Sequence, residues 1–66
     1  MYQLQIYMAD HPELKKVSQS EHSDILKWAE RKRYIKLKRF GRILFYTDQD
    51  LETALMWSVK DDYHRS

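Results

Sequence analysis

The sequence predicts a small α+β domain in the order β-α-β-β-α, with a three-stranded, mostly antiparallel sheet and two helices on one face. Three observations support this fold class. Residues 2–8 alternate between apolar and polar side chains, and residues 18–33 carry an amphipathic helical pattern. Residues 42–47 are apolar on both faces, which is typical of a central strand. Because a right-handed crossover makes the first two strands parallel, the third strand fits between them and the strand order is 1-3-2.

The chain is short, and its composition limits what can hold it together. It has 66 residues, which we interpret as one domain over residues 1–66. It contains no cysteine, so neither a disulfide framework nor a cysteine-ligated zinc site is available. The three histidines His11, His22 and His64 are scattered without a paired spacing. We therefore expect no metal and no cofactor.

The first strand is expected over residues 2–8. Tyr2, Leu4, Ile6 and Met8 fall on one face when alternate residues point the same way, as in a half-buried strand. The apolar pattern over residues 10–19 is thin, so this segment is expected to be a loop or a short helical turn.

The first helix is expected to begin near Ser18 or Ser20 and to end near Arg33. Ser18 and Glu21 have the Ser-x-x-Glu spacing of a capping box. Arg31, Lys32 and Arg33 lie in the last turn, where positive charge complements the helix dipole. The buried stripe is expected to consist of Ile25, Leu26 and Ala29, with Trp28 at its edge.

A β-hairpin and a second helix complete the expected fold. The hairpin has strands at residues 34–38 and 42–47, with Gly41 in the turn between them. Thr47 is a suitable N-cap for the helix that follows, and Asp48, Asp50 and Glu52 place negative charge in its first turn. The complete order resembles the ferredoxin-like split βαβ fold without its last strand.

The charge of the chain is strongly segregated. The net charge is only +2, but residues 27–42 contain eight basic residues and the single acid Glu30. The segments on either side are both acidic overall. The basic residues therefore coincide with the end of the first helix and with the hairpin, which indicates a binding surface rather than a general basic character.

In the predicted fold, one sheet face carries apolar residues towards the helices and the other face is open. The residues expected to point inwards are Leu4, Ile6, Ile35, Leu37, Ile43 and Phe45. Aromatic and basic side chains gather on the open face and at the hairpin tip, and such clusters are enriched at interfaces. The candidate partner-binding residues are Tyr7, Tyr34, Lys36, Lys38, Arg39, Arg42, Leu44 and Tyr46. The alternative interpretation is an ordinary solvated face, with lysines that protect an edge strand from aggregation.

Binding is a better hypothesis than catalysis for this composition. A single glycine leaves no glycine-rich phosphate loop, and no cysteine nucleophile or nucleophile-elbow serine is present. We expect a protein partner with an acidic surface. The alternatives are nucleic acid bound on the tyrosine and lysine face, and self-association as a homodimer. Without a signal peptide or an apolar run of membrane-spanning length, the sequence predicts a cytoplasmic location and no membrane contact.

Two segments also resemble a group of known proteins. They are Ile25-Leu26-Lys27-Trp28, before the hairpin, and the run Phe45-Tyr46-Thr47-Asp48-Gln49-Asp50-Leu51-Glu52-Thr53-Ala54-Leu55-Met56-Trp57. This pattern resembles short proteins encoded by tailed bacteriophages, and it covers about half the chain. Such proteins often bind and redirect a host enzyme. The resemblance implies a role as an inhibitor or modulator of a host protein, without implying any particular site residue.

Overall fold

The computed structural model describes residues 3–63, and it confirms the predicted fold class. Three strands form one antiparallel sheet in the order β1-β3-β2. The elements β1 (Lys15–Lys16), α2 (Ser23–Arg31), β2 (Lys38–Phe40), β3 (Ile43–Tyr46) and α3 (Asp48–Lys60) follow the predicted β-α-β-β-α order. A helix, α1 (Gln3–Asp10), precedes them, and a 3₁₀ turn, η1 (Val17–Gln19), follows β1.

The largest correction concerns the start of the chain. Residues 3–8 of the strand predicted over residues 2–8 belong to the helix α1, and Tyr2 lies outside the described residues. The same apolar residues support two periods. Leu4, Tyr7, Met8 and His11 stand at i, i+3, i+4 and i+7, and these are the residues of this segment that are partly protected from solvent. Burial therefore follows the helical period. Ile6, which would be on the buried face of the predicted strand, is 51% exposed.

The first strand is instead the two-residue β1, within the segment predicted to be a loop or a short helical turn. Lys15 pairs with Tyr46 and Lys16 with Phe45 in antiparallel register. Leu14 and Val17, on either side of the strand, are buried. Two apolar residues at this spacing are enough to fix a short edge strand, but they give no periodic signal in the sequence.

Helix α2 begins later than predicted. Ser18 lies in the 3₁₀ turn, so the predicted capping box with Glu21 does not form. The N-cap is His22, whose backbone N–H donates to the hydroxyl of Ser20 at 3.0 Å. Leu26 and Ala29 are fully buried and Trp28 is nearly so, which confirms the predicted stripe.

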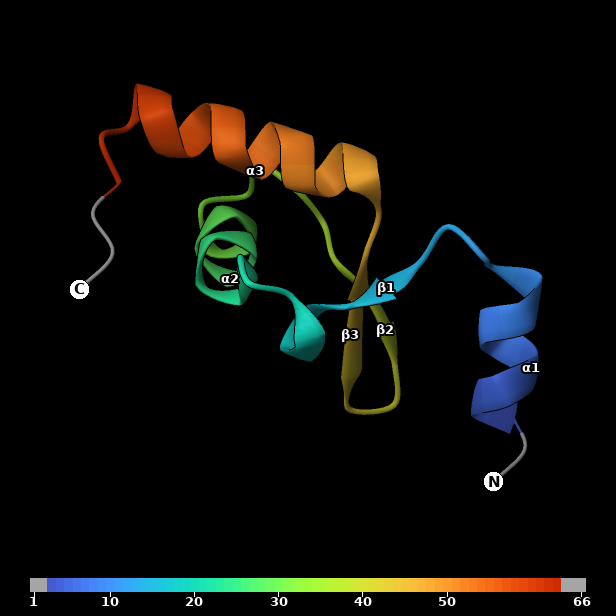
Figure 1. The fold of residues 1–66 in the computed structure, drawn as a ribbon. Coiled ribbons are helices and arrows are strands. Elements are labelled where there is room, and N and C mark those ends of the chain that lie inside the picture. The colour runs from blue at the N-terminus through green and yellow to red at the C-terminus, as the bar shows by residue number, and fades with distance from the viewer. Residues whose placement is uncertain (1–2, 64–66) are drawn as a thin grey trace.

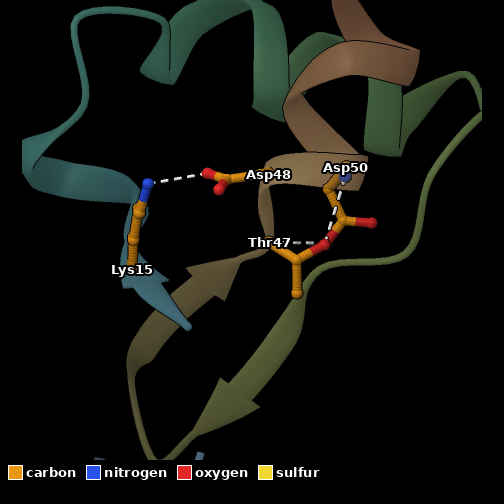
Figure 2. Close-up of polar contacts among 4 residues, drawn as sticks. All are labelled: Lys15, Thr47, Asp48 and Asp50. Carbon is orange, nitrogen blue, oxygen red and sulfur yellow. Dashed lines mark hydrogen bonds and ion pairs between the residues drawn. The ribbon is translucent and has the colours of Figure 1, made fainter. Parts of the chain in front are cut away.

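The predicted N-cap of helix α3, Thr47, is confirmed, and Asp48 and Asp50 lie in the first turn, whereas Glu52 lies beyond it. The side-chain oxygen of Thr47 accepts from Asp50 N–H at 3.2 Å, and the Asp50 carboxylate accepts from Thr47 N–H at 3.0 Å. Figure 2 shows these residues together with Lys15, whose Nζ lies 2.6 Å from Oδ1 of Asp48. That pair ties β1 to the first turn of α3. The hydrogen bond to Asp48 and the charge of its carboxylate raise the pKa of Lys15.

The main core lies between the sheet and the two helices α2 and α3. In Figure 1, α3 runs across the top of the molecule, and α2 is seen end-on below it, beside the strands. The main core includes the side chains of Val17, Leu26, Trp28, Ala29, Leu37, Tyr46 and Ala54. Leu44 also packs against this core, so Leu44 and Tyr46 define the sheet face that the helices cover.

On the opposite sheet face, Tyr7 of α1 packs against aromatic residues of the hairpin. The ring of Tyr7 lies 4.7 Å from the ring of Phe40 and 5.7 Å from that of Phe45, centroid to centroid. Phe45 is fully buried, whereas no residue of α1 is buried. Helix α1 stands at one end of an elongated molecule measuring 41 × 20 × 19 Å (Figure 1). None of the helices in residues 3–63 is long and apolar enough to cross a membrane.

A basic groove at the edge of the sheet

The structure divides the eight predicted partner-binding residues into two groups. Tyr34, Leu44 and Tyr46 were expected on an open sheet face, and this placement is wrong. Tyr46 is only 7% exposed, and Leu44 and Tyr34 pack against the main core. The reason is the hairpin register. Strand β2 begins at Lys38 rather than at Tyr34, and the even-numbered residues of β3 turn towards α2 and α3.

The cationic residues of the prediction remain exposed, and most of them gather in one place. Lys36, Lys38 and Arg39 line a hollow of about 520 Å³ together with Tyr7, Glu30 and Leu37. A neighbouring hollow of about 440 Å³ shares Glu30 and Lys36 and adds Arg33, Tyr34 and Ile35. We call the two hollows together the basic groove. It is lined by four cationic residues, Arg33, Lys36, Lys38 and Arg39, around the single acid Glu30.

The basic groove follows the outer edge of β2, which has no strand beside it in residues 3–63. Cross-strand partners share a sheet face, so Lys38 lies on the α1 side with Phe45, and Arg39 lies on the α2 side with Leu44. Tyr7 of α1 and Glu30 of α2 also line the groove. The groove therefore wraps around the strand edge, with one wall from each side of the sheet.

The hairpin turn determines which backbone groups face this groove. Gly41 has a φ of +61° and Arg42 has a negative φ, the pattern of a type II′ turn with two central residues. In such a hairpin the flanking pair Phe40–Ile43 is hydrogen-bonded, and the pairing alternates from there. The N–H and C=O of Arg39 therefore point away from β3 and into the groove.

The side chain of Glu30, from α2, extends into the groove and binds groups of the strand edge. One carboxylate oxygen accepts from Arg39 Nη2 at 3.1 Å, and the other accepts from the backbone N–H of Leu37 at 3.2 Å. The Leu37 N–H is the next outward-pointing donor along the edge, two residues before Arg39, as the alternation requires. A single side chain thus binds both the arginine and a backbone donor of the strand edge.

The end of α2 places Arg33 at the far end of the groove. Tyr34 N–H donates to Ala29 C=O at 2.9 Å and Arg33 N–H donates to Glu30 C=O at 2.9 Å, which is the Schellman pattern. Arg33 occupies the position with positive φ, at +66°, where glycine is the usual residue. An arginine at this position costs stability, about 1–2 kcal/mol relative to an unstrained backbone.

Arg42 does not belong to the basic groove. It lies at the hairpin tip and lines a separate, mostly apolar hollow of about 430 Å³ with Leu4 and Gln3 of α1 and with Phe40, Gly41 and Ile43. The cationic rim expected around the hairpin is therefore split. Lys36, Lys38 and Arg39 line the basic groove, and Arg42 lines the separate hollow at the hairpin tip.

The groove offers charge and backbone hydrogen bonds rather than reactive groups. Within residues 3–63 no three His, Cys, Asp or Glu side chains lie together in a way that could hold a metal ion. The shifted tyrosine pKa of this region belongs to Tyr34, whose hydroxyl donates to the Asp61 carboxylate. That hydrogen bond, with some burial, raises the pKa of Tyr34. The phenol stays protonated at neutral pH and acts as a structural link between helix ends.

Two charged residues of the groove, Arg33 and Glu30, were not predicted as site residues from the sequence. Arg33 was interpreted as a charge at the helix end, and Glu30 was noted only as the one acid in a basic segment. The sequence did contain a hint for Glu30, because the only acidic residue among eight basic ones has many possible ion-pair partners. Comparisons with protein-family models, with curated proteins and with solved structures found no match. The bacteriophage resemblance and its implied role therefore remain predictions.

Proposed function

We propose that the chain is a small protein-binding module that recognises an acidic segment of a partner protein through the basic groove. The observation that carries this proposal is the wrapping of four cationic side chains around a strand edge at which the N–H and C=O of Arg39 point outwards. Lys36 and Lys38 are exposed and have no ion pair with another residue of the described range 3–63. Their charge is therefore available to a partner.

A protein partner is favoured over nucleic acid by the position of the aromatic rings. Binding of single strands usually depends on exposed aromatic faces on which bases stack. Tyr46 is buried, and Tyr34 is stacked on Trp57. The remaining tyrosine of the expected platform, Tyr7, packs against Phe40 and Phe45. The groove keeps the cations of the predicted surface and lacks its stacking rings.

The proposed partner is a host protein if the implication of the bacteriophage resemblance holds. In that case the groove would dock on an acidic region of a host enzyme and modulate its activity. Opposite charges across such an interface accelerate association and align the two surfaces.

The proposal is tested by reversing charge inside and outside the groove. We expect Lys36→Glu with Lys38→Glu to abolish capture of the partner identified by affinity purification from the native host. The matched control is Lys27→Glu with Lys32→Glu, which makes the same change of charge on exposed residues of α2 and its C-cap that do not line the groove. Circular dichroism should show both variants folded.

Equal recovery of the partner by both double variants would contradict the proposal. A salt titration with random single-stranded DNA separates the nucleic-acid alternative. Micromolar binding that weakens steeply with salt would favour nucleic acid as the partner. Concentration-independent sedimentation of the free protein would remove self-association.

A further inference from the structure

We infer that the acidic segment binds as an extended strand that adds to the outer edge of β2, and that Glu30 is an internal competitor for the same site. This inference rests on the proposed function, because it specifies how the basic groove holds its partner. Strand addition uses backbone hydrogen bonds for affinity and side-chain positions for selectivity.

The first argument is the availability of the edge. Strand β3 has neighbours on both sides, and β2 has β3 on one side only within residues 3–63. The Arg39 N–H and C=O point outwards, as the register with Leu44 requires. An added strand would lie about 4.8 Å away from β2, along the edge that the basic groove follows.

The second argument is the distribution of charge around that edge. The strand register places Lys38 on the α1 side and Arg39 on the α2 side, and Lys36 lines both hollows of the basic groove. A partner strand would therefore meet cations on whichever face its acidic residues occupy. Charge complementarity selects an acidic strand, and it disfavours pairing of β2 with the β2 edge of a second copy, which carries the same lysines.

The third argument is the binding mode of Glu30. Its carboxylate contacts Arg39 Nη2 at 3.1 Å and the Leu37 N–H at 3.2 Å. These are the two kinds of contact that an acidic residue on an incoming strand would make: an ion pair with a groove cation and a hydrogen bond from the edge. The Glu30 side chain is 24% exposed and Arg39 is 61% exposed, so a partner can reach both.

The test uses the full chain and a short blocked peptide that alternates glutamate with valine. Two further peptides carry N-methyl groups, one on the odd-numbered and the other on the even-numbered backbone nitrogens. A strand added to one edge uses only alternate N–H groups towards that edge. We expect one methylated peptide to lose at least about tenfold in affinity and the other to change less than about twofold. Affinity is measured by isothermal titration calorimetry.

A readout on the protein itself locates the added strand. Hydrogen exchange of the Arg39 amide should slow by more than about tenfold when the peptide binds, because this N–H gains a partner. The amides of Lys38 and Phe40 are already directed at β3 and should change little. Unchanged exchange at Arg39 in the peptide-bound protein would overturn strand addition.

The role of Glu30 is tested by Glu30→Gln, with Glu21→Gln as the control that removes the same charge from an exposed residue outside the groove. Removing a competing carboxylate should raise the affinity for the glutamate peptide by roughly twofold to fivefold beyond the control. Equal affinities of the two variants would show that Glu30 does not compete.

The outcomes separate this inference from the proposed function. If both methylated peptides bind alike, whether tightly or not, strand addition is wrong. If in addition Lys36→Glu with Lys38→Glu still reduces binding of the unmethylated peptide, acidic recognition by the groove stands without it. A control peptide carries lysine in place of each glutamate. If the glutamate peptide binds no better than this lysine peptide, the proposed function fails as well.

Discussion

The ring of Tyr34 lies flat on the indole of Trp57, with centroids 4.1 Å apart and planes inclined by 7°. Tyr34 is the residue just after the left-handed position that ends α2, and Trp57 belongs to the last turns of α3. A second contact of the same kind joins the two helices in the opposite direction. Tyr63, in the corresponding place after α3, packs on Trp28 of α2 at 4.9 Å. The tyrosine that follows the end of each helix therefore packs against a tryptophan of the other helix.

This stacking predicts different costs for two substitutions of Tyr34. Tyr34→Ala removes the ring from Trp57 and Trp28, and we expect a loss of about 2 kcal/mol in the free energy of unfolding. Tyr34→Phe keeps the ring and should cost less than about 1 kcal/mol. Urea denaturation followed by tryptophan fluorescence measures both. Equal losses would show that the ring contact contributes little.

The hydroxyl of Tyr34 predicts a pH dependence at the alkaline end. Because its pKa is raised by the hydrogen bond to Asp61, the phenol contributes stability that is fully present below about pH 10, the unfolded value. That contribution is lost as the pH rises through the folded-state pKa. Melting temperatures of the wild type and of Tyr34→Phe should therefore converge between neutral and strongly alkaline pH. Lys15 titrates in the same range but is common to both proteins, so it cancels in the comparison.

Arg33 predicts a trade between stability and binding. Arg33→Gly relieves the positive φ of +66° at the end of α2 and should stabilise the fold by about 1 kcal/mol. It also removes a cation from the basic groove, so the glutamate peptide should bind roughly twofold to fivefold more weakly. The matched variant is Asp62→Gly, at the equivalent position after α3 with a φ of +54°. It changes the same kind of backbone position outside the basic groove and should leave peptide binding unchanged, so weaker binding by both variants would contradict a role for Arg33.

The cap of α3 predicts a third change in stability. Thr47→Ala removes the acceptor for Asp50 N–H and should cost about 1 kcal/mol. In a domain of this size that corresponds to a fall of about 4–8 °C in melting temperature. Thr53→Ala, in the middle of the same helix, is the control and should be neutral or slightly stabilising, since alanine favours helix. Differential scanning calorimetry distinguishes the two.

The hairpin turn predicts that Gly41 is needed for its backbone and not for its size. A β-carbon on Gly41 would meet no heavy atom within 4 Å, but the φ of +61° disfavours every L-residue. Gly41→Ala should therefore cost about 1 kcal/mol, and D-alanine introduced by chemical synthesis should cost nothing or stabilise. Thermal unfolding of the two proteins is the measurement. Equal losses with both residues would point to a steric cause.

The predictable parts of the fold are those with one dominant local signal. Strand β3 is an unbroken apolar run, and α3 begins after the N-cap Thr47 with acidic residues in its first turn, so both were identified from the sequence. The first residues carry two periodicities at once, and only packing of Tyr7 on Phe40 and Phe45 decides between them. Strand β1 is too short for any period, and it exists because β3 offers it an edge.

The candidate site was predicted in its charges but not in its geometry. Lys36, Lys38 and Arg39 were identified because basic residues are concentrated in that segment. The faces of Leu44 and Tyr46 were reversed, because a shift in hairpin register inverts every side chain of a strand. Glu30 could not be assigned from sequence, since its two partners, Leu37 and Arg39, depend on where α2 ends relative to the strand edge.

The two-residue strand β1 has a consequence for the order in which the chain folds. The hairpin closes through two residues, whereas pairing of Lys15 with Tyr46 must first close a loop of about thirty residues. Contacts between distant segments form late because their entropy cost comes before their reward. We expect substitutions at Leu14 and Lys15 to accelerate unfolding and leave the refolding rate nearly unchanged. The hairpin and its two helices would then be the nucleus, and residues 3–16 would dock onto a structure already formed.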